Sequence, residues 1–165
     1  MEIIKLSRND AGKIAALIAR FRVALRSYTG IASEIDEEAG REEAEEYLNA
    51  GWPVYAAREG DRYVGYLVCR IEGPCVWAES LYVEPGYRRR GVASALFEKA
   101  EEIAASFGGD TVFNYVHPNN DGVIAFLKSR GYDVLNLIEL RKPYDGEEVR
   151  GTMRVGGHEY RYGNG

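Results

Sequence analysis

The chain has 165 residues and a net charge of −5, with 45% hydrophobic and 28% charged residues. This length and composition predict a globular chain of one domain with a substantial core. The net negative charge argues against a broad nucleic-acid-binding surface. The charge is uneven, because the segment 34–46 holds eight acidic residues and one arginine, which leaves the rest of the chain slightly positive.

Nothing in the sequence predicts a metal site, export or membrane insertion. The two cysteines, Cys69 and Cys75, lie in strand-like runs without metal-site spacing, so we expect small buried side chains. The longest apolar helical run, near 14–25, contains Arg20 and Arg22 and is too polar to span a bilayer. The N-terminus lacks a signal-peptide pattern. We therefore expect a cytoplasmic protein with no metal, nucleic-acid or membrane partner.

The first half of the chain predicts a strand, two helices and an antiparallel meander. Residues 2–6 have the pattern of a strand, and the following helix, which ends near Ser27, carries apolar residues at three- and four-residue spacing. Residues 31–50 predict an acidic helix with one side in water. Three strands follow, separated by glycine turns. They are expected at residues 54–59, 63–72 and 76–83.

The second half alternates helices with strands. A helix is predicted at 92–107, a strand at 111–116, a helix that ends near Arg130, and a further strand at 132–141. Because a helix joins strand 76–83 to the next strand, these two strands should be parallel neighbours with a right-handed crossover. The expected fold class is α/β (α+β), a central mixed β-sheet flanked by about four helices.

The last stretch, 143–165, predicts a β-hairpin, with arms at 151–155 and 158–162. Its amphipathy is weak, so three roles stay open: packing at a sheet edge, forming a homodimer, or remaining a loosely ordered tail. We expect one domain at 1–142 and a C-terminal extension at 143–165.

A glycine turn lies between strand 76–83 and helix 92–107, and three arginines precede its Gly91. Glycine permits a sharp turn and a close approach of backbone to a ligand. The first N–H groups of a helix have no partners within it and form an anion site together with the helix dipole. Arginine donors are suited to phosphate. The turn therefore predicts a phosphate or pyrophosphate site, and a solvated basic turn or a scaffold that binds another anion is the alternative.

Two motifs carry a family resemblance. Residues 88–93, Arg-x-x-Gly-x-Ala, resemble the Arg/Gln-x-x-Gly-x-Gly/Ala turn of the GNAT superfamily of acyl-CoA-dependent N-acyltransferases, and residues 81–85, Leu-Tyr-Val-x-Pro, are similar to the strand before that turn. Residues 120–132, Asn-x-x-Val-x-x-Phe-Leu-x-x-x-Gly-Tyr, are similar to the family's Asn-x-x-Ala-x-x-Phe-Tyr-x-x-x-Gly-Phe. The resemblance covers roughly residues 1–142.

The resemblance implies a central mixed sheet whose two middle parallel strands splay apart, with the acyl arm of the cofactor between them. It implies an N-acetyltransferase that moves an acetyl group from acetyl-CoA to a primary amine, by direct transfer in a ternary complex. The amine could belong to a small molecule, a polyamine, a protein lysine or a protein N-terminus. No cysteine or serine is placed to carry a covalent acyl group.

The resemblance also implies the cofactor-binding residues. In the family, the strand before the turn pairs its backbone with pantetheine like an added strand, and here an N–H, that of Val83, would polarise the thioester carbonyl. Asn120 inherits the family asparagine's contact with the cofactor, although a plain helix cap is also expected there and Asn119 is easily confused with it. The predicted cofactor-binding residues are Leu81, Tyr82, Val83, Arg88, Arg89, Arg90, Gly91, Val92, Ala93, Ser94 and Asn120.

The catalytic assignments are less direct. Glu79, two residues before the cofactor strand motif, is expected to deprotonate or anchor the amine, with an exposed strand glutamate as the alternative. His117 ranks second as a base. Leu127 stands where the family carries the tyrosine that protonates the departing thiolate, so Tyr115 is the candidate donor, with a core or rim tyrosine as the alternative. This replacement leaves open a non-catalytic acyl-CoA-binding sensor of the same fold.

The acidic segment 34–46 bears on the acceptor. In the family, the first two helices help to form the acceptor groove, so an acidic groove would favour a cationic amine. A solvated helix face is the alternative.

Overall fold

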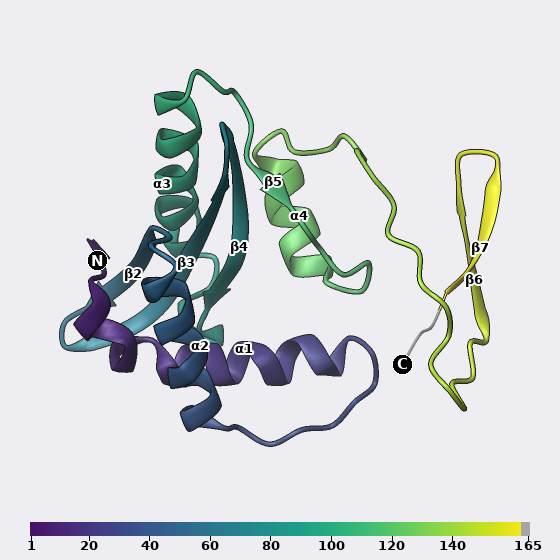
Figure 1. The fold of residues 1–165 in the computed structure, drawn as a ribbon, viewed down its shortest axis with the longest axis horizontal. Helices are drawn as coiled ribbons and strands as arrows, with labels where there is room; N and C mark the ends of the chain where they lie inside the picture. Colours follow the sequence, from purple (N-terminus) through teal and green to yellow (C-terminus); the bar gives the residue numbers. More distant parts are fainter. Residues whose placement is uncertain (163–165) are drawn as a thin grey trace. The chain divides into compact units, whose positions relative to one another are not determined.

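A computed structural model describes residues 1–162, which divide into two compact units (Figure 1). The first unit comprises residues 1–23 and 34–115, and the second comprises residues 24–33 and those from 116 onward. The residues of each unit contact one another more than they contact the other unit. The expected domain boundary at residue 142 is a separate matter and stays a prediction.

The first unit is built on a five-stranded mixed sheet in the order β1-β2-β3-β4-β5. The first four strands pair antiparallel, and β4 and β5 pair parallel. The structure therefore confirms the predicted mixed sheet and its parallel neighbours (Figure 1). The strands are β1 Glu2–Lys5, β2 Val54–Glu59, β3 Arg62–Glu72, β4 Cys75–Val83 and β5 Phe113–Asn114.

Four α-helices and two short 3-10 helices accompany the strands, in agreement with the prediction of about four helices. Alternation of apolar and polar residues at helical spacing gives each helix of the first unit one buried face. The α-helices are α1 Ala15–Ser27, α2 Glu37–Asn49, α3 Val92–Ser106 and α4 Asp121–Ser129, and the 3-10 helices are η1 Arg8–Lys13 and η2 Pro85–Tyr87.

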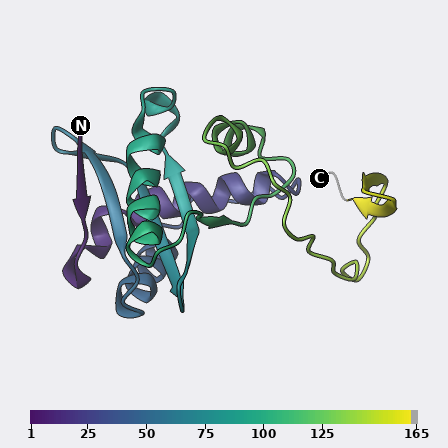
Figure 2. The same ribbon diagram turned by 90° about the horizontal axis from the view of Figure 1, so that it is seen from above.

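Different helices cover the two faces of the sheet. Tyr66 of β3 belongs to the hydrophobic core with Ile18 of α1 and Leu48 of α2. Successive strand residues point to opposite faces, and at the neighbouring Gly65 an added Cβ would lie 3.3 Å from Leu96 of α3. α3 contacts β2, β3 and β4 along its length (Figure 2). The sheet is thus a middle layer, with α1 and α2 on one face and α3 on the other.

Close backbone contact explains one helical glycine. Gly40 of α2 lies against α1, where a Cβ would clash with the carbonyl oxygen of Ala15 and lie 3.0 Å from the backbone nitrogen of Ala19. Glycine normally weakens a helix. Here it allows α1 and α2 to pack with their backbones close together.

The first unit also fixes its helix starts with polar side chains. Ser7 and Asp10 form a reciprocal capping box at η1, and Lys13 pairs with Asp10 at 2.6 Å. The hydrogen bond from Lys13, followed by those from Ser7, lowers the pKa of Asp10 from 3.8 to about 2. The side chain of Asp36 caps α2 by accepting the N–H of Ala39 at 2.9 Å.

The acidic segment lies mostly in water. Five glutamates of α2 are exposed. Glu43, by contrast, accepts hydrogen bonds from Arg22 of α1 and from the hydroxyl of Tyr47. One carboxylate of the segment is therefore neutralised towards the core, whereas the five exposed glutamates form a solvated helix face. The exposed glutamates are Glu37, Glu38, Glu42, Glu45 and Glu46.

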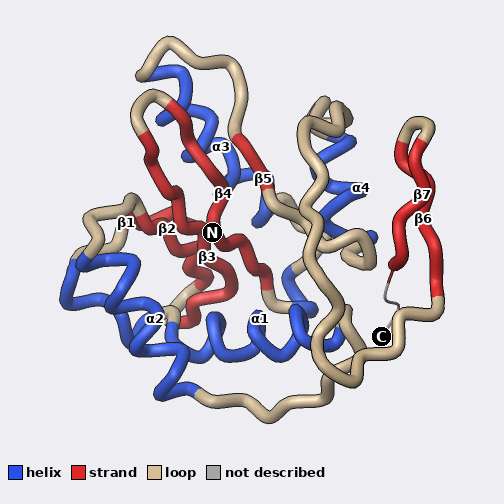
Figure 3. Tube along the Cα trace, turned by 45° about the vertical axis from the view of Figure 1, so that its right-hand side comes forward, coloured by secondary structure: helices blue, strands red, loops and turns tan. Residues whose placement is uncertain are grey.

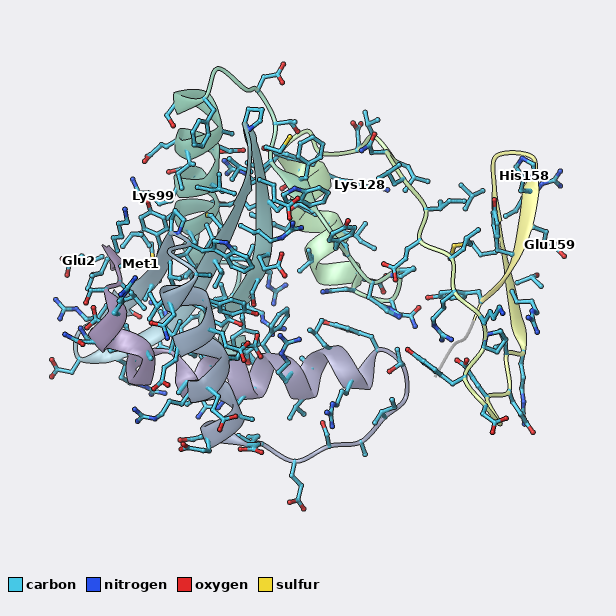
Figure 4. The ribbon with its side chains drawn as sticks, in the orientation of Figure 1. Met1, Glu2, Lys99, Lys128, His158 and Glu159 are labelled. Carbon is cyan, nitrogen blue, oxygen red and sulfur yellow. The ribbon has the colours of Figure 1, made fainter. Side chains whose placement is uncertain are left out.

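The second unit holds α4 and the two-stranded hairpin of β6 Gly151–Val155 and β7 His158–Tyr162. This confirms the predicted hairpin. Figure 4 shows His158 and Glu159 on β7, and both are exposed.

One predicted strand is wrong. Residues 132–141 form a loop, drawn tan in Figure 3, and Val134 is 86% exposed. The run is mostly apolar, as a buried strand is, but a strand also needs a neighbour to accept its backbone hydrogen bonds. β5 is likewise shorter than the predicted strand at 111–116, since only Phe113 and Asn114 pair with β4.

Both cysteines are free thiols. Cys69 is buried among apolar groups, and this burial raises the pKa of its thiol to about 12. Cys75 is half-buried. Across residues 1–162, none of the helices combines the length and the apolar character that crossing a bilayer requires.

Candidate active site

The sheet of the first unit opens between β4 and β5. The two strands pair only at Trp77 with Phe113 and at Ala78 with Asn114. β4 continues for five further residues, 79–83, and no strand of the described chain pairs with their outer edge. The middle parallel strands therefore splay, as the family resemblance implied.

The open edge of β4 presents main-chain hydrogen-bonding groups. The N–H of Glu84 donates to the carbonyl of Val64 in β3 at 2.9 Å. Because strand residues alternate in direction, the N–H and C=O groups of Val83 and Leu81 point away from β3. The carbonyl of Val83 accepts from Nε of Arg88 at 2.9 Å. The N–H of Val83 and both backbone groups of Leu81 remain for a ligand.

The intervening residue, Tyr82, turns its backbone the other way. Its side chain is buried in the core with α1 and α2. Its contribution to the edge is to hold β4 in place by packing, whereas the backbone groups that face outward belong to the residues on either side.

A β-bulge places Glu79 at the start of this edge. Val68 of β3 pairs with Ser80, and the next residue, Cys69, pairs with Ala78. Glu79 is thus the extra residue of the bulge, a feature that redirects side chains. Its Oε2 accepts from Nε of Arg70 at 2.6 Å, and its side chain is 30% exposed.

Arg70 links Glu79 to an aromatic stack. Its guanidinium also pairs with Glu72 and lies 4.9 Å from the ring centroid of Trp77. Burial lowers the pKa of Arg70, but the hydrogen bonds to Glu79 and Glu72 outweigh this and raise it. The ring of Tyr115 stacks on Trp77 with centroids 4.8 Å apart. The structure therefore brings both predicted catalytic residues, Glu79 and Tyr115, into one cluster.

The glycine turn has the geometry of an anion site. Gly91 has φ of +81° and precedes α3 without any side-chain cap. The first helical N–H with a backbone partner is that of Ala95, which donates to Gly91, so the three N–H groups before it face outward. Arg89 also has a positive φ, of 56°. A non-glycine residue in this region is strained, and such strain often marks a binding site.

Two of the three arginines of the turn are engaged with neighbouring strands. Arg88, besides its bond to the Val83 carbonyl, lies 5.7 Å from the ring of Tyr82. Arg90 pairs with Glu59 at 2.8 Å. Arg89 has no ion pair with any residue in 1–162. The backbone and Arg89 are therefore the groups that are directly available to a phosphate.

These groups fit a thioester cofactor with an amide-bearing arm and a diphosphate. The free edge of β4 matches the amides, and the uncapped start of α3 matches the diphosphate. A Cβ added at Gly91 would meet no atom within 4 Å, so the turn has open space. Among the described residues, no group of three or more His, Cys, Asp or Glu side chains is arranged to hold a metal ion.

In the second unit, Asn120 caps α4. Its side chain is almost buried and accepts the N–H of Val123 at 3.2 Å. Its neighbour Asn119 donates to the carbonyl of Tyr28 at 2.8 Å and accepts from Tyr162, which makes it a structural residue. The cap that the sequence predicts is present, and the cofactor contact of Asn120 stays a prediction.

His117 and Leu127 also lie in the second unit. Nδ1 of His117 accepts the N–H of Asn119 at 3.1 Å, the ring stacks on Tyr28, and burial lowers its pKa. The hydrogen bond to Nδ1 and the lowered pKa both favour the neutral form of this imidazole. Leu127 is buried, as expected of an apolar side chain.

Sequence reasoning missed Arg70 and Trp77. Their place in the cluster follows from the hairpin register, in which Arg70 pairs directly with Trp77. Counting outward from the Gly73-Pro74 turn would have placed these two residues opposite each other, and cross-strand partners interact.

Solved structures share this fold. One is the aminoglycoside N-acetyltransferase AAC(6')-Iy in complex with the bisubstrate analogue CoA-S-monomethyl-acetylneamine, with a TM-score of 0.64 at 18% identity over 87% of this chain and 98% of the other. Another is a ribosomal-protein-alanine N-acetyltransferase of Brucella melitensis, with a TM-score of 0.62 at 16% identity over 87% and 100%. The fold is thus one that acetyltransferases use.

Sequence comparison goes further. The model of the acetyltransferase (GNAT) family matches residues 20–132. An uncharacterized N-acetyltransferase of Mycobacterium tuberculosis is 31% identical over 76% of this chain and 84% of its own. A probable N-acetyltransferase of Drosophila melanogaster is 29% identical over 65% of this chain, and the match spans 63% of that relative's length.

The chain belongs to the GNAT family of acetyltransferases. By class it is an acyltransferase, and acetyl-CoA is the cosubstrate that the family uses. The resemblance drawn from residues 81–93 and 120–132 is confirmed.

Proposed function

We propose that the protein is an N-acetyltransferase that moves an acetyl group from acetyl-CoA to a primary amine, by direct transfer in a ternary complex. The observation that carries this proposal is the unpaired edge of β4, which runs directly into the uncapped start of α3. An extended thioester cofactor needs backbone partners along its arm and an anion site at its end, and these two features supply both.

Cofactor binding rests on main-chain groups. Leu81 and Val83 would hydrogen-bond the pantetheine arm, and the N–H of Val83 would polarise the thioester carbonyl. The turn from Arg88 to Ser94 would hold the diphosphate, with Arg89 as the side chain free to reach it. For Asn120, the cofactor contact rests on the family motif alone. Acetyl-CoA, when bound, supplies the acetyl group as an activated thioester.

Glu79 would act on the amine. In the reaction, the ammonium first gives up one proton. The neutral amine nitrogen then bonds to the acetyl carbon, the carbon–sulfur bond breaks, and the nitrogen loses a second proton while the thiolate gains one. The Oε1 atom of Glu79 makes no hydrogen bond within the described residues, so it can accept a hydrogen bond from the incoming ammonium. Glu79 thereby positions the amine and takes up its proton, directly or through water.

The hydroxyl of Tyr115 is the candidate that returns a proton to the thiolate, because Leu127 has no proton to give. A covalent acyl-enzyme has little support. Cys69 is buried with its pKa raised to about 12, which makes it a poor nucleophile. The hydroxyl of Ser80 is buried and hydrogen-bonded to that of Tyr66 at 2.7 Å. Direct transfer is therefore the simpler route.

The acceptor is a primary amine, and the candidates are a small amine, a polyamine, a protein lysine and a protein N-terminus. Structural neighbours include aminoglycoside acetyltransferases, so aminoglycosides belong among the amines to be tested. The exposed glutamates of α2 favour a cationic acceptor through long-range attraction.

A second candidate function is a non-catalytic acyl-CoA-binding sensor. Leu127 favours it, because the residue is buried and stands where the family motif carries a tyrosine. Such a sensor keeps the cofactor site and lacks turnover.

Two measurements test the proposal. Thermal unfolding with acetyl-CoA and with pyrophosphate asks whether the site prefers the thioester cofactor, since a ligand that binds the folded state raises its stability. Thiol release is then followed with acetyl-CoA and a panel of small amines, polyamines, aminoglycosides and peptides. The enzyme proposal is supported if turnover depends on Glu79. In that case Glu79→Gln transfers the acetyl group slowly while its affinity for acetyl-CoA is unchanged. Equal stabilisation by both ligands contradicts cofactor binding, and tight binding without turnover favours the sensor.

A further inference from the structure

We propose that Tyr115, backed by Trp77, forms an aromatic shelf beside Glu79 that selects a primary ammonium group carried on an apolar, aromatic body. This deepens the proposed function by naming the acceptor class, and it rests on that function only for the subsequent acetyl transfer. The shelf, the carboxylate and their connecting arginine all belong to the first unit.

The shelf and the carboxylate form one continuous cluster. Arg70 bonds Glu79 at 2.6 Å and lies 4.9 Å from the Trp77 centroid, and Trp77 stacks on Tyr115 at 4.8 Å with ring planes 17° apart. Phe113 lies against Trp77 from the next strand, with centroids 5.0 Å apart. The rings and the carboxylate therefore occupy the same face, beside the bulge.

Tyr115 is the exposed end of this stack. It is 66% exposed, whereas Trp77 is half-buried between its neighbours. An aromatic ring that is fixed by stacking on one face and open to water on the other is a surface on which a second ring gains contact area. A cation near such a ring gains a further attraction.

The charges around Arg70 favour an ammonium ion. One guanidinium serves two carboxylates, those of Glu72 and Glu79, so this group of three keeps a net charge of −1. Arg70 is 16% exposed and holds Glu79 through Oε2, which leaves Oε1 for a donor. The guanidinium thus fixes the direction of the carboxylate without cancelling its attraction for a cation.

The net charge of −1 on Arg70, Glu72 and Glu79 favours one type of acceptor over another. A single unbalanced negative charge beside one open ring matches a single ammonium group with an apolar body. A polyamine has no aromatic body to stack on the ring and would bring further cations towards Arg70. We therefore expect an arylalkylamine to bind better than an amine of the same charge without a ring.

Two probes test this difference directly: 2-phenylethylamine and ethylamine, which differ only by the phenyl group. Each is titrated into the full chain while the indole N–H signal of Trp77 is followed by NMR. The chain has two tryptophans, so Trp52→Phe assigns the signals. In the unmodified chain we expect 2-phenylethylamine to bind at least about tenfold tighter than ethylamine, because only its phenyl group can stack on the ring of Tyr115.

Matched variants separate the ring from other effects. Tyr115→Ala should reduce the preference for the aromatic amine to about twofold, whereas Tyr115→Phe should retain it, because the ring remains. Glu79→Gln should weaken both amines alike. Tyr144→Ala is the control, since Tyr144 is also exposed and has an arginine 4.2 Å from its ring centroid but is not part of the stack.

Each outcome decides the matter. An unmodified chain that binds neither amine, or binds both equally, overturns the shelf, and so does a Tyr115→Ala variant that keeps the preference. Acetyl transfer is assayed separately with the same two amines. Selective binding without transfer would favour the sensor over the proposed enzyme and leave the shelf intact, whereas transfer without selectivity would support the enzyme and overturn the shelf.

Discussion

Gly91→Glu is the sharpest perturbation of the proposed cofactor site. The substitution places a carboxylate at the start of α3, where the turn is proposed to hold a diphosphate. Gly91 has φ of +81° and no atom within 4 Å of an added Cβ, so the new side chain fits sterically but strains the backbone. This strain costs about 1 kcal/mol of folding free energy, which corresponds to a loss of roughly 2–4 °C in the unfolding temperature.

The effect on binding should be larger. A unit charge about 4 Å from a phosphate charge is repelled by about 4 kcal/mol at an effective dielectric constant of about 20. Solvent and salt at an exposed turn reduce this to about half. Since about 1.4 kcal/mol is a tenfold change, acetyl-CoA affinity should fall by at least about thirtyfold.

Gly51→Glu is a matched control. Gly51 has φ of +76° and no atom within 4 Å of an added Cβ, so it should suffer the same strain, but it follows the end of α2. Gly91→Gln tests bulk without charge and should retain more affinity than the glutamate. Isothermal titration with acetyl-CoA measures all three variants. An unchanged affinity in Gly91→Glu, or an equal loss in Gly51→Glu, would refute the placement of the phosphate site.

Two further predictions concern stability. Gly40→Ala should lower the unfolding free energy by about 2 kcal/mol, because its Cβ meets the backbone of α1. Gly122→Ala in α4, where an added Cβ has no atom within 4 Å, should raise it by up to about 1 kcal/mol. Urea unfolding measures both variants, and equal effects would contradict the close contact at Gly40. Asp10 should stabilise the fold above pH 4 and not near pH 2. Its folded pKa is lowered from 3.8 to about 2, so its contribution is complete above the unfolded value and is lost as the pH falls through the folded one. The gap in unfolding free energy between the unmodified chain and Asp10→Asn should therefore close towards pH 2, and a gap that stays constant would argue against the ion pair.

Elements defined by local signals could be predicted from the sequence. The strand at 54–59 has the predicted bounds, and the helix expected at 92–107 ends one residue earlier. Both are bounded by residues that act locally, such as the glycine turn at Gly60 and the positive φ of Gly91. The anion site at the turn follows from the same local rules, which is why the motif could be assigned without a structure.

Features that depend on register could not be predicted. The bulge at Glu79 exists because β3 and β4 change their pairing between Val68 and Cys69. No residue type in the sequence indicates this change of pairing. The ion pair of Glu79 with Arg70 depends on that register. The run at 132–141 shows the opposite failure, since its apolar composition is typical of a strand but a strand forms only where another edge accepts its hydrogen bonds.

The unpaired edge of β4 has a consequence for how such a site changes over evolutionary time. Its hydrogen-bonding groups belong to the main chain, so they keep their positions whichever strand-forming side chains flank them. Substitution can replace residues such as Leu81 while the pattern of donors and acceptors stays the same. Most of the site is therefore inherited as backbone shape and leaves little trace in side-chain identity. This accords with solved acetyltransferases that keep the fold at 16–18% identity.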